Sequence, residues 1–152
     1  MPLHFADLDA LKSHFQNKEN GFIVIDWRNC PDYEGMALSI MLVFDTRQSR
    51  WQLDLQWISL GLDPYGDTLQ ESYVYQFTSL DELLEYLLLK YQIKVTDIPI
   101  HYQFDPDKFP DPVKDGAKKA LFEASWKRFQ HDFLNGAFFD PALTIVYNSL
   151  DN

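Results

Sequence analysis

Few residues of this 152-residue chain have the type and spacing that catalysis or metal binding requires. The chain has four histidines, His4, His14, His101 and His131. None has another histidine four residues away, and Cys30 is the only cysteine, so the ligand spacing of a zinc site is missing. Cys30 precedes Pro31 and has no nucleophile signature around it, which favours a small apolar role beside a turn. We therefore expect structural or solvated roles for these side chains and no metal site among them.

Nucleotide chemistry is not indicated either. The chain contains no Gly-x-Ser-x-Gly elbow, no Gly-x-Gly-x-x-Gly loop and no Walker loop. Its six glycines leave few places where bare backbone could approach a phosphate. The sequence therefore predicts no cofactor.

Paired carboxylates are the remaining candidates for acid–base work or for binding a hard cation. Asp63 and Asp67 lie in one turn, where a cation could lie between them, but the turn lacks the alternating ligands of a calcium loop. This favours an ordinary turn. Asp26 and Asp54 lie in expected strands, and either becomes an acid–base candidate if it faces inward. The sequence leaves their burial open.

The elements that must position these residues follow from the hydrophobic pattern. Apolar or alternating runs predict four strands, at residues 22–27, 37–46, 51–60 and 73–77. Their short connections favour antiparallel pairing in a meander. Residues 95–104 are the candidate fifth strand, at an edge because of Pro99. We expect one α+β domain over residues 1–152, with an antiparallel meander sheet of four to five strands packed against two or more helices.

Helical spacing is predicted in four segments, at residues 7–18, 79–91, 117–135 and 140–150. Ser79 and Glu82 form a capping-box pattern before a leucine-rich face, and Gly136 is the expected end of the third helix. That third helix has an aromatic stripe made of Phe122, Trp126, Phe129 and Phe133. Asp140 and Pro141 are the expected start of the fourth helix. Residues 105–112 contain three prolines, which predicts a stiff connector.

The net charge of −10 is concentrated in the middle of the chain. Between Trp51 and Leu89 there is no Lys or Arg, and the acids there are Asp54, Asp63, Asp67, Glu71, Asp81, Glu82 and Glu85. Such a chain lacks the basic footprint of nucleic-acid binding and suits a basic protein surface or a metal, unless the charge serves only solubility. No apolar run approaches the roughly 20 residues that span a bilayer, and no secretory signal is visible. We therefore expect a cytoplasmic protein without membrane insertion.

Aromatic residues are unusually frequent, with 4 Trp, 8 Tyr and 12 Phe. A domain of this size cannot bury all of these rings deeply, and aromatic rings are common in binding patches as well as in cores. Phe109, Phe138 and Phe139 are the candidates for partial exposure.

The last third of the chain resembles a known family. The segments Phe-Pro-Asp-Pro (109–112), Ala-Ser-Trp-Lys-Arg-Phe (124–129) and Phe-Phe-Asp-Pro-Ala-Leu-Thr-Ile-Val-Tyr-Asn-Ser-Leu (138–150) carry this likeness. They are similar to the chlororespiratory reduction protein six family of cyanobacteria and plastids, which assembles the photosynthetic NAD(P)H dehydrogenase-like (NDH-1) complex. The resemblance covers residues 105–150. It implies a soluble, non-enzymatic factor that helps to insert an iron–sulfur subunit into the hydrophilic arm, and it brings no catalytic motif.

Three hypotheses follow. The first is a binding or assembly protein that contacts its partner through Phe109, Asp111, Lys127 and Arg128. The second is an acidic immunity protein that neutralises a basic toxin through the acids Asp63, Asp67 and Glu71. The third is an enzyme, such as a hydrolase, with a carboxylate site that no motif reveals. The partner of the first two is another protein, and the oligomeric state stays open.

Overall fold

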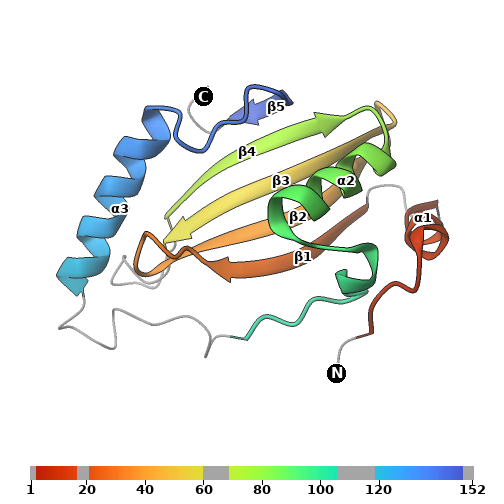
Figure 1. Ribbon diagram of the computed structural model, residues 1–152, viewed down its shortest axis with the longest axis horizontal. Coiled ribbons are helices and arrows are strands. Elements are labelled where there is room, and N and C mark those ends of the chain that lie inside the picture. The colour runs from red at the N-terminus through yellow and green to blue at the C-terminus, as the bar shows by residue number, and fades with distance from the viewer. Residues whose placement is uncertain (1–2, 17–20, 60–68, 106–118, 149–152) are drawn as a thin grey trace.

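A five-stranded antiparallel sheet forms the centre of the computed structural model, which describes residues 3–16, 21–59, 69–105 and 119–148 (Figure 1). The strand order follows the chain: β1 (Gly21–Asn29), β2 (Met36–Asp45), β3 (Arg50–Ser59), β4 (Leu69–Phe77) and β5 (Thr144–Asn148). The described α-helices are α1 (Leu8–Gln16), α2 (Leu80–Tyr91) and α3 (Lys119–Leu134). Together these elements make a single α+β domain, which confirms the predicted fold class and the four-strand meander.

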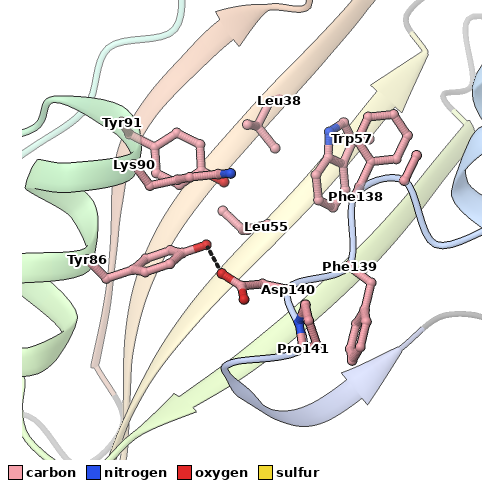
Figure 2. Close-up of a pocket in the computed structure, with 11 residues that line it drawn as sticks. Leu38, Leu55, Trp57, Tyr86, Lys90, Tyr91, Phe138, Phe139, Asp140 and Pro141 are labelled. Atoms are coloured by element: carbon pink, nitrogen blue, oxygen red, sulfur yellow. Dashed lines mark hydrogen bonds between the residues drawn. The ribbon is translucent and has the colours of Figure 1, made fainter.

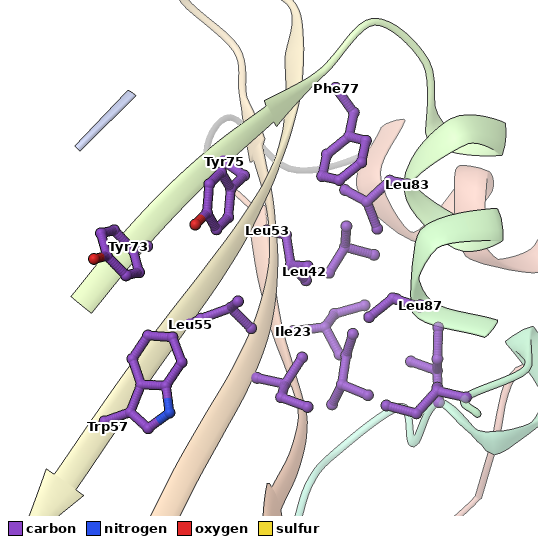
Figure 3. Close-up of a cluster of buried hydrophobic side chains, with 14 of the residues drawn as sticks. Ile23, Leu42, Leu53, Leu55, Trp57, Tyr73, Tyr75, Phe77, Leu83 and Leu87 are labelled. Carbon is purple, nitrogen blue, oxygen red and sulfur yellow. The ribbon is translucent and has the colours of Figure 1, made fainter. Parts of the chain in front are cut away.

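One face of the sheet carries the core. Cross-strand neighbours Ile23, Leu42, Leu53 and Tyr75 form a row across four strands, and all four are buried. Leu55 and Trp57 continue the same face of β3, as the period of two predicts. Figure 3 shows these side chains meeting Leu83 and Leu87 of α2. The polar residues Gln52, Asp54 and Gln56 lie on the opposite face, but they are buried or half-buried rather than fully wet.

Helix α2 lies across the core face because its start and its apolar side are both well defined. The Ser79 hydroxyl accepts a hydrogen bond from the Glu82 amide at 3.2 Å, as the capping pattern predicts. The Glu82 carboxylate accepts one from the Thr78 hydroxyl at 2.5 Å. Leu80, Leu83 and Leu87 are buried, so the leucine face packs on the sheet.

Helix α3 stands near one end of the strands, with α1 near the other (Figure 1). Its predicted aromatic stripe is buried, with Phe122, Trp126, Phe129 and Phe133 at 6% exposure or less. Trp126 and Phe129 stack at 5.5 Å, and Trp57 of the sheet lies 5.9 Å from Phe133, so the stripe joins the core. Gly136 follows the helix with φ of 79°, a left-handed conformation that suits glycine.

Two element predictions are wrong. Residues 144–148 form strand β5 instead of a helix, and Tyr147 pairs with Val74 of β4. The edge of β4 offers backbone hydrogen-bond partners to the β-branched run Thr144-Ile145-Val146. Asp140 begins a turn rather than a helix, because its carboxylate accepts a hydrogen bond from the Ala142 amide at 3.0 Å.

The expected strand over residues 95–104 is also absent from the described sheet. Val95–Asp97 is a 3₁₀ turn (η1), in which the Asp97 carboxylate accepts a hydrogen bond from the Lys94 amide. Pro99 makes only an isolated bridge with His4, since proline has no N–H for a ladder.

Some predictions fall outside the described residues. They concern residues 17–18, 60, 106–112, 117–118 and 149–150, at the ends of predicted elements and in the proline-rich connector. Among the helices in the described ranges, none is both long and apolar enough to cross a membrane.

Candidate functional site

The predicted contact residues do not gather at one place in the described structure. Four of them lie outside the described residues: Asp63, Asp67, Phe109 and Asp111. Glu71 is half-buried on β4, where it pairs with Trp57 in the ladder. Lys127 and Arg128 are exposed on α3.

Arg128 has a role within the fold. Its guanidinium donates a hydrogen bond to the Asp32 carbonyl oxygen and lies over the Tyr33 ring, 5.0 Å from the centroid. The Tyr33 hydroxyl donates to the Asp132 carboxylate at 2.6 Å, and this hydrogen bond lowers the pKa of Asp132. These contacts tie the loop between β1 and β2 to α3.

A cavity of about 470 Å³ opens on the core face between α2 and the segment that follows α3 (Figure 2). Its floor is formed by Leu38, Leu55 and Trp57 of the sheet. One wall is formed by Tyr86, Lys90 and Tyr91 of α2, and the opposite wall by residues 137–141. The wall side chains thus come from two segments that are about 50 residues apart in the chain.

A second cavity, of about 250 Å³, adjoins the first. Both are lined by Leu38, Trp57, Tyr91 and Phe138. The second extends along the end of β1 and the loop that follows it, from Arg28 to Tyr33, and Arg128 holds this loop against α3. We refer to the two cavities together as the groove.

Asp140 closes one side of the groove through three hydrogen bonds. Its carboxylate accepts from the Tyr86 hydroxyl at 3.2 Å and from the Ala142 amide at 3.0 Å. Its own amide donates to the Tyr75 hydroxyl at 3.1 Å. Burial, reinforced by Tyr91 and Asp140, raises the pKa of Tyr86, so this phenol stays a neutral donor. The segment after α3 is therefore anchored to both α2 and β4.

The groove has few reactive groups. Burial, with a smaller contribution from Asp32, raises the pKa of Cys30 to about 11, so its thiol is protonated at neutral pH. Nowhere in residues 3–16, 21–59, 69–105 and 119–148 do three or more His, Cys, Asp or Glu side chains gather in a way that could hold a metal ion. The lining instead combines the aliphatic and aromatic side chains of the floor with a hydrogen-bonded pair, Tyr86 and Asp140.

The two basic residues Arg28 and Lys90 line the groove and differ in their ion pairs. Arg28 forms an ion pair with Asp26, with Nε and Oδ2 2.7 Å apart, and lies 5.8 Å from the Tyr91 ring centroid. Burial raises the pKa of Tyr91 to about 12. Lys90 is exposed at the rim and makes no ion pair with any described residue.

Asp54, one of the two carboxylates singled out in the sequence, is half-buried on the opposite face of the sheet. One carboxylate oxygen is fully enclosed without a hydrogen-bond partner, and the other accepts from the Gln56 amide at 3.4 Å. Burial raises the pKa of Asp54 to about 6. Its direct neighbours across the ladder are Met41 and Val74, so no second titratable group stands beside it there.

Sequence patterns missed the groove. Tyr86 and Lys90 lie four residues apart on one side of α2, which is the single local signal of a wall, while Leu38 and Asp140 belong to distant segments. No protein-family model, curated protein or solved structure matches this chain.

Proposed function

We propose that this chain is a non-enzymatic binding protein that holds an apolar segment of another protein in the groove. The observation that carries the proposal is the lining of the groove. The apolar side chains that face its open space are those of Leu38, Leu55, Trp57 and Phe138. The Tyr86 hydroxyl donates a hydrogen bond to the Asp140 carboxylate, so these two polar groups are already paired. A preformed cavity with an aliphatic and aromatic floor, in which the Tyr86 hydroxyl and the Asp140 carboxylate are paired with each other, favours binding over catalysis.

The groove is large enough to supply useful affinity. Full burial of one Leu or Phe side chain of a partner contributes about 1.5–3 kcal/mol. Two such anchors, one in each cavity, would contribute enough to offset part of the cost of association. Trp57 on the floor and Tyr91 on one wall are of residue types that are enriched among the side chains contributing most to binding energy at interfaces.

For the partner, we propose an iron–sulfur subunit of the hydrophilic arm of the NDH-1 complex, with the chain acting as an assembly factor in the cytoplasm. The likeness of residues 105–150 to the chlororespiratory reduction protein six family supports this proposal. In such a role, the groove would cover an apolar segment of the subunit until the arm replaces it. The net charge of −10 suits a subunit surface that is basic.

The test measures the affinity of the purified iron–sulfur subunit for the wild-type chain and for two variants by isothermal titration calorimetry. Leu38→Trp places a larger side chain where the two cavities meet, and we expect it to weaken binding at least about 10-fold. Leu121→Trp makes a similar change at an exposed site on α3 and should leave the affinity unchanged.

Circular dichroism must show that both variants keep the fold. Equal affinities for wild type and Leu38→Trp would remove the groove as the binding site. No heat of binding with wild type would remove this partner.

A second candidate is the acidic immunity protein, which is favoured by the exposure of Asp81, Glu82 and Glu85 on α2. Capture of a basic toxin would slow steeply as salt is raised, because opposite fields speed the encounter. Binding through the apolar groove would depend on salt much less.

A further inference from the structure

Helix α2 carries the opposite charges of Glu82 and Lys90 on either side of Tyr86, and of these residues Tyr86 and Lys90 line the groove. Glu82, Tyr86 and Lys90 follow one another at intervals of four residues, so they lie on one side of the helix. With a rise of about 1.5 Å per residue, Glu82 and Lys90 are about 12 Å apart along the axis. Tyr86, between them, lines the groove.

The acidic residue that lines the groove beside Tyr86 is Asp140, on the opposite wall. Its hydrogen-bond donors are the Tyr86 hydroxyl and the Ala142 amide, and the donor to Glu82 is the Thr78 hydroxyl. These donors are neutral, so they satisfy the oxygens without cancelling either charge. The groove is therefore negative near the middle of α2.

The basic end is formed by Lys90. No acidic side chain in the described residues forms an ion pair with Lys90. Figure 2 shows Lys90 and Asp140 both projecting into the space between α2 and residues 137–141, at different levels along the groove. Beyond Tyr91 the second cavity is lined by Arg28, whose charge is paired with Asp26, and by Asp32.

Figure 2 shows Leu55 between Asp140 and Lys90, with Leu38, Trp57 and Phe138 farther along the floor and the side away from α2. An occupant that contacts both charges therefore also covers the apolar side chain of Leu55 between them.

We propose that the groove selects a polypeptide segment of matching polarity, in which a bulky apolar side chain stands between a basic residue at the Asp140 end and an acidic residue at the Lys90 end. This inference rests on the proposed function, because it requires that the groove binds a polypeptide. It adds what the segment looks like and in which direction it lies. The complementary charges both attract the segment and set its orientation.

The experiment begins with a phage-displayed library of random 12-residue peptides, selected on the immobilised full chain. Peptides that also bind Leu38→Trp are removed, so that the remaining ones require the open groove. We expect the enriched sequences to share a Leu, Phe or Trp with a Lys or Arg on one side and an Asp or Glu on the other.

The orientation is then tested by charge exchange. The best peptide is synthesised with a fluorescent label and titrated by anisotropy against wild type, Lys90→Glu and Lys12→Glu. Lys12 is exposed on α1, so its variant has the same net charge without changing the groove. We expect Lys90→Glu to weaken binding by about 3- to 10-fold, Lys12→Glu by less than 2-fold, and a peptide whose acidic residue is replaced by Lys to regain affinity for Lys90→Glu.

The outcomes separate the two proposals. Enriched peptides that share only apolar residues, or that bind Lys90→Glu and Lys12→Glu equally, would overturn the polarity and leave the groove as a binding site. No enrichment over Leu38→Trp would overturn both. Elution of wild type as a dimer that Leu38→Trp converts to a monomer would identify the occupant as a second copy and overturn the proposed segment.

Discussion

Asp54 has a partly buried carboxyl group, and the ionised form of this group destabilises the folded protein. The carboxyl lies on the central strand β3 between Met41 and Val74, with one oxygen enclosed and unpartnered. Burial favours the neutral acid and raises the pKa from 3.8 to about 6. The folded state therefore binds this proton more tightly than the unfolded state does.

We expect a pH-dependent loss of stability from this one residue. The stabilisation by the bound proton is complete below pH 3.8 and is lost as the pH rises through about 6. After allowance for partial exposure, the loss between pH 5 and pH 8 should be about 1 kcal/mol. Urea unfolding of wild type and Asp54→Asn measures it, and the variant should gain that amount relative to wild type at pH 8. Glu123→Gln, at an exposed site on α3, is the control and should show no such gain. A constant difference between wild type and Asp54→Asn at both pH values would contradict this account.

Cys30 should be a slow nucleophile. Its pKa of about 11, against an ordinary 9.0, leaves roughly 100-fold fewer thiolates at pH 8. We expect alkylation by iodoacetamide to be slower in the folded protein than in urea by about that factor. Mass spectrometry of quenched samples gives both rates, and similar rates in the two states would show that the thiol is open and ionisable.

At the scale of elements, the loop between β1 and β2 and helix α3 depend on each other. Gly35 has φ of 79°, and a Cβ atom there would lie 1.5 Å from Cδ1 of the buried Phe122 ring. The loop lines the second cavity, so this close approach also shapes the groove. Arg128 and Tyr33 add polar contacts between the same two elements.

We expect Gly35→Ala to destabilise the fold by about 2–4 kcal/mol, because it adds both backbone strain and a clash. Gly136→Ala is the matched control: its φ is also 79°, but nothing lies within 4 Å of the new Cβ, so it should cost only about 1–2 kcal/mol. In a Phe122→Ala background, Gly35→Ala should fall to the cost of the control. Chemical denaturation measures each difference, and equal costs for the two glycines in the wild-type background would disprove the close packing.

The molecule as a whole carries a large negative charge. A net charge of −10 on one domain makes the folded state repel itself, and added salt screens that repulsion. We expect the Tm at pH 7.5 to rise by several degrees when NaCl is increased from about 20 mM to about 500 mM. Near pH 4.6, where the net charge vanishes, the same salt should have little effect. A Tm that falls with salt at pH 7.5 would mean that attractive ion pairs dominate.

Local patterns in the chain carry most of the fold. The buried side of β3 is predicted by the alternation of Leu53, Leu55 and Trp57. The buried side of α3 is predicted by the aromatic stripe from Phe122 to Phe133. The Ser79 cap is local as well, and its hydrogen bond forms as the pattern predicts. The α+β class and the order of the first four strands follow from such short-range features.

Long-range contacts decided the rest. Residues 144–148 have helical spacing but become β5, because the β-branched run pairs with the edge of β4, a strand far earlier in the chain. The groove exists because Leu38, Tyr86 and Asp140 meet from three distant parts of the chain, and the Tyr86–Asp140 hydrogen bond spans 54 residues. The burial of Asp54 likewise depends on its neighbours across the sheet. The hydrophobic pattern of one segment does not indicate which distant segments it will contact, so these contacts are known only from the tertiary structure.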